Sequence, residues 1–282
     1  MIIDSHTHTF PEKIVDAAVP KMEAAAKIKA RLRGTLTALS GSIRDAGIDM
    51  AINLPVATNP AQPRKLNTAA ISINEQTADT GIMSFGAMHP DDPNWREELT
   101  FIAENGIKGI KLHPMYQGVA FDDIRYERII GKAAELGLCV TVHAGEDIGI
   151  PGPSKCSPDH ILRVLRDTGA DKLIFAHMGG WGLWDRVKGE LCGAPVYIDT
   201  SFSFGKATFN PLFPRTQEEL KMGNTELLRE IILSHGASRI LFGSDSPWGD
   251  EKSEIENIKA LRLSAEDTEL VFSGNMTRLL NL

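Results

Sequence analysis

The feature that most constrains this fold is the regular alternation of short apolar runs with segments of helical length. Eight such runs occur, and most are closed by proline, glycine or a polar residue: Met1–Thr9, Asp49–Pro55, Ile82–Pro90, Ile107–Pro114, Leu138–Gly145, Lys172–Gly179, Ala194–Ser201 and Arg239–Pro247. Between them, apolar residues recur at three- and four-residue steps, as in amphipathic helices. The clearest examples are Trp95–Asn105, Tyr126–Leu136, Pro158–Gly169, Leu183–Leu191 and Thr225–His235.

Near-continuously apolar strands joined by helices predict a parallel sheet that is covered on both faces. Eight βα units is the number that closes such a sheet, so we expect an α/β fold, a (β/α)8 TIM barrel with its site at the carboxyl ends of the strands. A doubly wound open sheet is the alternative. It favours a glycine-rich turn after the first strand, where this chain has H-T-H-T-F-P. No linker divides the chain, so residues 1–282 are expected to form one domain.

Charge and cysteine content narrow the functional class. The formal net charge is −7 and no basic run occurs, which argues against a nucleic-acid partner. The three cysteines lack C-x-x-C spacing, so neither a disulfide framework nor a structural zinc cluster is indicated. No signal peptide or membrane-spanning stretch is recognisable. We expect a cytoplasmic protein that acts on a small molecule without a membrane partner, and homo-oligomerisation is left open.

Histidines are concentrated at the ends of the predicted strands. Asp199 and Asp245 lie near the ends of the seventh and eighth strands, and six of the eight histidines lie at the ends of others: His6, His8, His89, His113, His143 and His177. Because the carboxyl ends of barrel strands meet at one mouth, residues as far apart as His6 and Asp245 become neighbours. We expect His89 to be a core residue, and His160 and His235 to lie on the surface or to pack against helices.

The first strand carries the pattern D-S-H-T-H, which predicts a metal site. Side chains alternate along a strand with a period of two, so Asp4, His6 and His8 fall on one face. Histidine is the commonest metal ligand, and two imidazoles on one face can share one ion. The pair alone is a weak signal, and it gains weight from the histidines and Asp245 at the other strand ends.

Five strand-end motifs carry a resemblance to a known family. They are D-S-H-T-H, I-K-L-H-P, V-H-A-G, A-H-M-G and F-G-S-D-S-P. Together they resemble the amidohydrolase superfamily, and more narrowly its amidohydrolase-2 branch, which includes aminocarboxymuconate-semialdehyde decarboxylase. The resemblance extends from Ile2 to the closing G-N-M-T-R-L-L. It implies one divalent metal, usually zinc, held by His6, His8, His143 and Asp245, with His177 beside it. The same donors also suit manganese, iron or cobalt.

The activity that this resemblance implies is metal-dependent hydrolysis of a small polar or carboxylate-bearing substrate. The ion would lower the pKa of its water, Asp245 would take the water's proton, and His177 would polarise the carbonyl or stabilise the oxyanion. The alternative is a lyase that decarboxylates an aromatic or dienoic carboxylate, or a hydratase, on the same metal. A barrel that only binds a ligand is disfavoured, because none of the five positions has been replaced.

Further candidates lie at the same predicted mouth. Lys111 and His113 share one face of the fourth strand. The resemblance favours one metal over two metals bridged by a modified lysine, so we expect Lys111 to contact substrate or to pair with a carboxylate such as Asp4. His113 is expected to serve either the site or the structure. The loops after the strands add possible pocket walls and weaker charged candidates: Trp181, Trp248, Glu146, Lys206 and Arg215. The long loops Glu146–Asp159 and Phe202–Gly223 are expected to set specificity.

Overall fold

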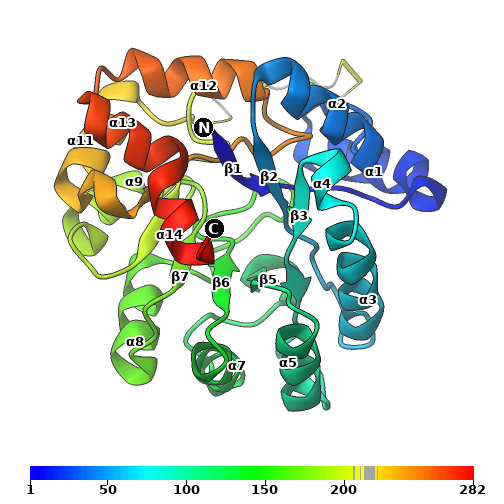
Figure 1. Cartoon of the computed structure of the whole chain (residues 1–282). Helices are drawn as coiled ribbons and strands as arrows, with labels where there is room; N and C mark the ends of the chain where they lie inside the picture. Colours follow the sequence, from blue (N-terminus) through cyan, green and yellow to red (C-terminus); the bar gives the residue numbers. More distant parts are fainter. Residues whose placement is uncertain (206, 210, 213–219, 221) are drawn as a thin grey trace.

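Strands occupy the centre of the molecule and helices surround them (Figure 1). The computed structural model describes residues 1–205, 207–209, 211–212, 220 and 222–282. Nine strands are assigned among these residues: β1 (Ile3–Thr7), β2 (Met50–Asn53), β3 (Ile82–Ser84), β4 (Gly86–Ala87), β5 (Gly109–Leu112), β6 (Cys139–Val142), β7 (Leu173–Phe175), β8 (Tyr197–Asp199) and β9 (Ile240–Leu241). Each is shorter than the apolar run that predicts it, because the end of each run leaves the sheet as a loop.

Helices occupy the five segments named from the sequence and several others. Their bounds are α1 (Glu12–Ala26), α2 (Leu36–Ala46), α3 (Pro63–Asn74), α4 (Thr77–Thr80), α5 (Trp95–Glu104), α6 (Pro114–Gln117), α7 (Ile124–Glu135), α8 (Pro158–Thr168), α9 (Trp184–Arg186), α11 (Thr225–His235), α12 (Glu251–Ala260), α13 (Ala265–Glu269) and α14 (Asn275–Leu280). A π-helical segment, Val187–Leu191, continues α9, and Leu270–Gly274 joins α13 to α14. Glycines in the left-handed region end several helices, including Gly47 after α2 and Gly169 after α8.

All strand pairs are parallel, which confirms the predicted α/β class. One sheet has the order β1-β2-β3 and the other the order β4-β5-β6-β7-β8-β9. Backbone hydrogen bonds join β1 to the segment after β9, from Ser5 N to Phe242 O at 2.8 Å and from Asp245 N to His6 O at 2.8 Å. The first and last predicted strands are therefore neighbours, and the ends that carry His6 and Asp245 meet.

The third predicted strand is divided, which corrects the single run expected at Ile82–Pro90. β3 pairs with β2, and β4 pairs with β5. Between them the side chain of Asn67 accepts a hydrogen bond from the backbone of Ala87 at 2.7 Å. A Cβ on Gly86 would lie 2.8 Å from the Asn67 amide oxygen, so only glycine fits there. The hydrogen bond to the Asn67 side chain takes the place of a hydrogen bond between strands. The periodicity of apolar residues in the sequence does not reveal such a contact.

Two apolar clusters stabilise the strands. The larger one packs the helices against the sheets, and the smaller one joins inward residues of the strands, such as Ile3, Ile52 and Ile174, to α14. Met276 and Leu279 of α14 are 2% and 5% exposed, so this C-terminal helix is part of the core. In Figure 1 it lies in front of the strands. The opposite ends of the strands are left to polar side chains.

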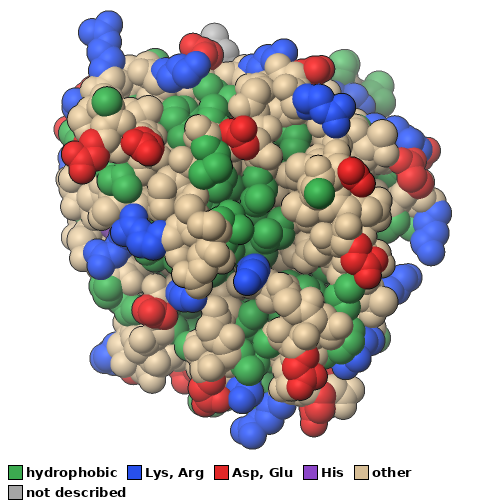
Figure 2. Space-filling view, in the orientation of Figure 1, with side chains coloured by type: hydrophobic (Ala, Val, Ile, Leu, Met, Phe, Trp, Pro, Cys, Tyr) green, Lys and Arg blue, Asp and Glu red, His purple; other side chains and the backbone are tan. Residues whose placement is uncertain are grey.

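Charged side chains of both signs are spread over the face shown in Figure 2. On the face shown in Figure 2, Lys and Arg alternate with Asp and Glu around the rim, and hydrophobic side chains lie toward the middle. This face has no continuous basic patch of the kind that binds nucleic acid. Among the described residues, no helix is both long enough and apolar enough to cross a membrane.

Two carboxyl groups are buried in the protein, Asp4 in β1 and Glu254 in α12. Asp4 accepts hydrogen bonds from the backbone of His6 at 3.1 Å and of Ser244 at 3.0 Å. Burial raises the pKa of Asp4 to about 8, and it raises the pKa of Glu254 in α12 to about 8 as well. Both groups are therefore largely protonated in the folded protein at neutral pH.

These carboxyl groups make stability depend on pH. The unfolded chain releases the Glu254 proton near pH 4.5, whereas the folded protein keeps it until about pH 8. The free energy of unfolding should therefore fall between these values, by up to about 1.4 kcal/mol for each pH unit from this group. Glu254→Gln should make the fall shallower in urea titrations. The exposed neighbour Glu256, as Glu256→Gln, should keep the wild-type slope. Equal slopes in all three proteins would contradict this assignment.

Candidate metal centre

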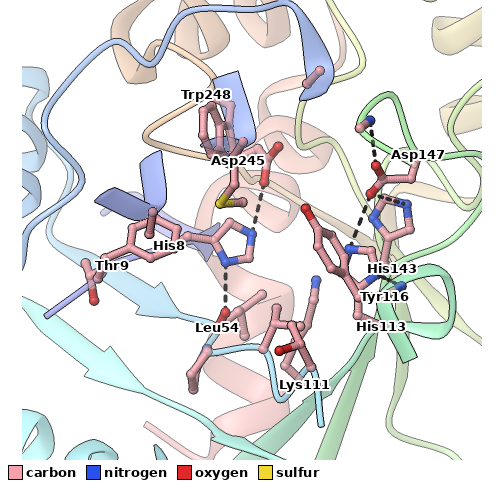
Figure 3. Close-up of a pocket in the computed structure, with 18 of the residues that line it drawn as sticks. His8, Thr9, Leu54, Lys111, His113, Tyr116, His143, Asp147, Asp245 and Trp248 are labelled. Atoms are coloured by element: carbon pink, nitrogen blue, oxygen red, sulfur yellow. Dashed lines mark hydrogen bonds and ion pairs between the residues drawn. The ribbon is translucent and has the colours of Figure 1, made fainter. Parts of the chain in front are cut away.

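A cavity of about 420 Å³ opens at the carboxyl ends of the strands. Its lining includes all nine residues that the sequence predicts for the site: His6, His8, Lys111, His113, His143, His177, Trp181, Asp245 and Trp248. Figure 3 shows His8 and Asp245 on one side of the cavity and His143 and Asp147 on the other, with Lys111 and Tyr116 between them. The parallel topology thus brings strand ends from across the whole chain to one place.

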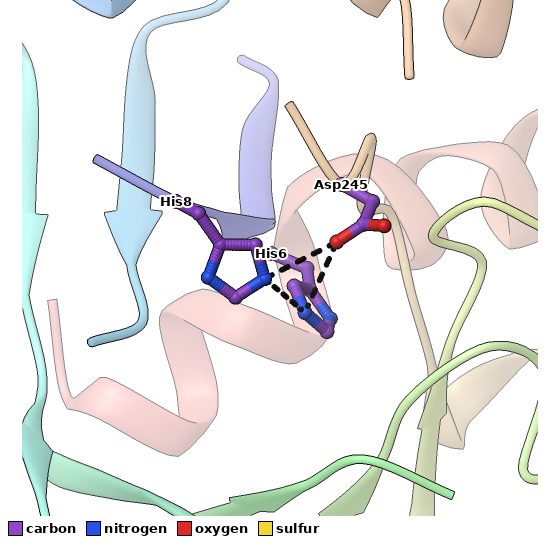
Figure 4. A group of neighbouring side chains, drawn as sticks. All are labelled: His6, His8 and Asp245. Atoms are coloured by element: carbon purple, nitrogen blue, oxygen red, sulfur yellow. Dashed lines mark hydrogen bonds and ion pairs between the residues drawn. The ribbon is translucent and has the colours of Figure 1, made fainter. Parts of the chain in front are cut away.

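Three of the four predicted ligands converge on one point (Figure 4). The Nε2 atoms of His6 and His8 are 3.2 Å apart. The Oδ1 atom of Asp245 lies 3.5 Å from the first of these nitrogens and 3.2 Å from the second. All three side chains are largely buried, so solvent does little to screen the electrostatic interactions among them.

The hydrogen-bond partners of the Nδ1 atoms of His6 and His8 define which ring nitrogens carry protons. Nδ1 of His6 lies 2.8 Å from Oδ2 of Asp199, and Nδ1 of His8 lies 2.8 Å from the backbone oxygen of Leu54. Both partners accept hydrogen bonds, so in the neutral rings each Nδ1 carries the proton and each Nε2 presents a lone pair. Burial and the charge of Lys111 hold the pKa of His6 well below its usual range. The neutral ring is the form that binds metal.

Three electron-pair donors therefore face one another at close range. Such a cluster is unfavourable without a cation, because each donor repels the other two. Donors that bind one ion at about 2.1 Å lie about 3.0–3.4 Å from each other, close to the separations observed. Two imidazoles and a carboxylate suit zinc and also manganese, iron or cobalt. His6, His8 and Asp245 could therefore hold a divalent metal.

The fourth predicted ligand, His143, points elsewhere. Its Nε2 donates to the backbone oxygen of Glu146 at 3.1 Å, and its Nδ1 lies 3.0 Å from Nε2 of His177. The ring of His143 stacks on His113 with centroids 4.1 Å apart. His143 groups with His113 and Asp147 as a second set of possible metal donors. The structure thus separates His143 from the other three predicted ligands.

This second group is less suited to a metal. Nδ1 of His113 accepts the backbone N–H of Tyr116 at 3.3 Å, so in the neutral ring the proton lies on Nε2. That Nε2 faces Oδ2 of Asp147 at 3.5 Å, and Nε2 of His143 lies 3.7 Å from the same oxygen. Protonated ring nitrogens cannot ligate an ion. In this arrangement the group forms a polar wall of the cavity.

His177 lies between the two groups. Its Nδ1 donates to the backbone oxygen of Ser201 at 2.9 Å, and its backbone N–H donates to Asp199 at 3.0 Å. Burial and the neighbouring His143 lower the pKa of His177 to about 4. His177 and Asp245 both have positive φ angles, 58° and 64°. Such angles are uncommon for residues with a Cβ and often mark functional sites.

Lys111 is buried beside the three converging donors. Its Nζ lies 3.0 Å from Nε2 of His6, and burial lowers its pKa to about 8. The expected pairing with Asp4 is wrong, because Asp4 accepts its hydrogen bonds from the backbone of His6 and from Ser244. The carboxylates that favour the charged form of Lys111 are Asp199 and Asp245. In this structure the Lys111 ammonium supplies positive charge to the donor cluster.

Sequence reasoning assigns no role to three residues that shape the site. Asp199 orients His6 and His177. Its position at the end of β8 is the sequence feature by which this role could have been predicted. Tyr116 and Asp147 line the cavity and lie three and four residues after His113 and His143. His89 is buried, as predicted, and His160 lies at the amino end of α8. The weaker candidates Lys206 and Arg215 lie outside the described residues.

Comparison with known proteins adds the family. The amidohydrolase family model matches residues 3–282. No curated protein matches the chain. The fold is similar to a manganese-bound 5-carboxyvanillate decarboxylase from Novosphingobium aromaticivorans, at 15% identity and TM-score 0.71, with 100% of this chain and 97% of that chain covered.

Two further solved structures share the fold. A candidate 2-pyrone-4,6-dicarboxylic acid hydrolase from Pseudomonas putida is 19% identical with a TM-score of 0.64, covering 99% of this chain and 97% of that chain. A TIM-barrel protein from Bordetella bronchiseptica is 16% identical with a TM-score of 0.73, and the match covers 99% of this chain and 98% of that chain. At these identities the likeness concerns the fold alone. Because the family model spans nearly the whole chain, this protein belongs to the amidohydrolase family, as its strand-end motifs predict.

Proposed function

We propose that this protein is a metal-dependent hydrolase of the amidohydrolase type. The observation that carries the proposal is the convergence of three largely buried lone-pair donors, on His6, His8 and Asp245, at the separations that one ion requires. We also infer that residues 1–282 form one (β/α)8 barrel domain, in which β3 and β4 act as a single strand. The hydrogen bonds from β1 to the segment after β9 support this inference.

We assign one divalent ion, preferably zinc, to His6, His8 and Asp245. His143, the expected fourth ligand, is left out of this set because its Nε2 donates to Glu146 and its Nδ1 faces His177. When bound, the ion supplies a Lewis acid that polarises a carbonyl and makes hydroxide available at neutral pH. Asp199 holds the ring of His6 in the tautomer that ligates. The hydrogen bond from His8 to Leu54 does the same for the second ring.

The remaining polar groups act on the substrate. The pKa of Asp245 is lowered to about 2 despite its burial, because the surrounding histidines favour its charged form. Asp245 is therefore ionised at neutral pH, the form that can ligate an ion and accept a hydrogen bond from the attacking water. Neutral His177 lines the same cavity; its Nδ1–H is donated to Ser201, so its Nε2 lone pair can accept a proton or a hydrogen bond from a substrate hydroxyl or from water. The Lys111 ammonium can hold an anionic group of the substrate.

Decarboxylation is the second candidate, and the position of Lys111 favours it. A buried ammonium beside the metal donors can bind a substrate carboxylate. The surrounding walls are largely apolar, and transfer of a carboxylate into such a site destabilises it relative to water. The manganese-bound structural neighbour is described as a decarboxylase. The same cavity therefore supports either reaction.

The two reactions are separated by product analysis. The zinc- or manganese-loaded protein is incubated with a panel of esters, lactones and amides, and in parallel with hydroxybenzoic acids, while carbon dioxide is measured. We expect hydrolysis of at least one panel member, with none in His6→Ala. Carbon dioxide release without any hydrolysis, lost in His177→Ala, would overturn the first proposal in favour of the second. Full activity in the metal-free protein would contradict both.

A further inference from the structure

We propose that the cavity contains an apolar subsite along α1 that binds a hydrocarbon part of the substrate. This inference rests on the proposed function for the position of the polar head group, at the metal donors. The wall of the subsite comes from α1, from the segment after it, from the start of α3 and from the loop after β6. Its apolar residues include Ile14, Ala18, Met22, Ile28, Leu66 and Ile148.

Helix α1 has two apolar faces, one buried in the core and the other only partly covered by protein. Val15 and Val19 are 1% and 7% exposed and pack in the main core. Ile14, Ala18 and Met22 follow one another at four-residue steps and line the cavity. Ile14 is 44% exposed, although it is a large apolar residue. A helix needs one apolar stripe to pack on a protein core. A second, partly exposed stripe that lines a cavity is typical of a ligand-binding groove.

The apolar wall is continuous with the metal donors. Leu54 lines the cavity, and its backbone oxygen accepts the hydrogen bond from His8. At the loop after β6, a Cβ on Gly149 would lie 3.8 Å from the Cβ of Ala26, so α1 and this loop are in contact. A ligand bound at His6 and His8 can therefore extend along α1 within the same cavity. Apolar walls with few convergent polar groups are typical of small-molecule sites.

The distribution of charge defines the class of ligand. Charged and imidazole groups of the lining gather around Lys111 and Asp245, whereas on α1 the lining carries a single charge, Lys13. Lys13 and Lys65 are exposed. A purely polar substrate would leave the α1 wall in contact with water. The cavity therefore fits an amphipathic molecule, with a metal-binding head and an alkyl or alkyl-aryl body, rather than the small polar substrate that the sequence suggests.

A series of alkyl hydroxamates, from acetohydroxamate to octanohydroxamate, tests this subsite by calorimetric titration of the zinc-loaded protein. The head group binds zinc, and only the tail varies. We expect the affinity to rise about threefold to fourfold for each added methylene. Met22→Asp and Ala18→Trp should remove this dependence and leave acetohydroxamate binding unchanged. Met22→Leu and Ile124→Asp, the latter on the exposed surface of α7, should keep the wild-type series.

Each outcome decides one proposal. A series that is flat in the wild-type protein, or unchanged in both Met22→Asp and Ala18→Trp when these are folded by circular dichroism, overturns the subsite. If hydroxamates bind equally well with and without zinc, the metal assignment fails. In that case a dependence on chain length that is lost in Met22→Asp still supports the subsite. The two failures are therefore distinguishable.

Discussion

Replacing His6 with alanine should reduce the metal content to less than about a tenth of the wild-type value and the turnover by roughly three orders of magnitude. His6 contributes one of the three converging lone pairs, and its ring contacts Asp199, His8 and Lys111. No other described nitrogen is oriented to replace it at this point. Metal content is measured by mass spectrometry after dialysis against zinc, and folding is checked by circular dichroism.

Two companion variants show whether the effect follows from coordination. Asp199→Asn should weaken metal binding by about 10- to 100-fold, because the amide no longer fixes the tautomer and orientation of the His6 ring. His160→Ala removes a histidine that lies at the amino end of α8. It should cost about 1 kcal/mol of stability and leave the metal content intact. Full metal occupancy in His6→Ala would refute the assigned centre.

The sequence predicts the members of the site better than their orientation. Each strand ends in a residue that the parallel topology must bring to one mouth, so His6, His113, His177 and Asp245 could be placed together without coordinates. The orientation of His143 could not be predicted, because it depends on a hydrogen bond to Glu146 and on stacking against His113. Such local choices leave no periodic signal.

The cavity wall formed by α1 also could not be predicted from the sequence. The second apolar stripe of α1 lines the cavity only through the way that α1 packs over the strand ends. The division of the third strand at Phe85 depends on the side chain of Asn67, which belongs to α3. Both features arise from tertiary contacts between elements that are separate in the sequence.

Replacing Lys111 with methionine should raise the dissociation constant of carboxylate ligands about 100-fold and leave neutral esters nearly unaffected. A charge-assisted hydrogen bond in a buried site typically contributes about 1.5–3 kcal/mol, and methionine removes the charge without opening a large cavity. In the wild-type protein the pKa of Lys111 is about 8, so carboxylate binding should weaken as the pH rises through this value. In Lys111→Met this pH dependence should disappear.

The same substitution also tests how the metal and the lysine share His6. An ammonium 3.0 Å from the His6 Nε2 repels a cation at that nitrogen, so Lys111→Met should bind zinc at least as tightly as the wild-type protein. The exposed Lys108, three positions earlier on the same segment, provides the matched control as Lys108→Met. Loss of zinc in Lys111→Met would mean that the lysine supports the metal rather than the substrate. Equal weakening of carboxylates and neutral esters would show that it acts through packing, because a charge distinguishes the two ligands and a methylene chain does not.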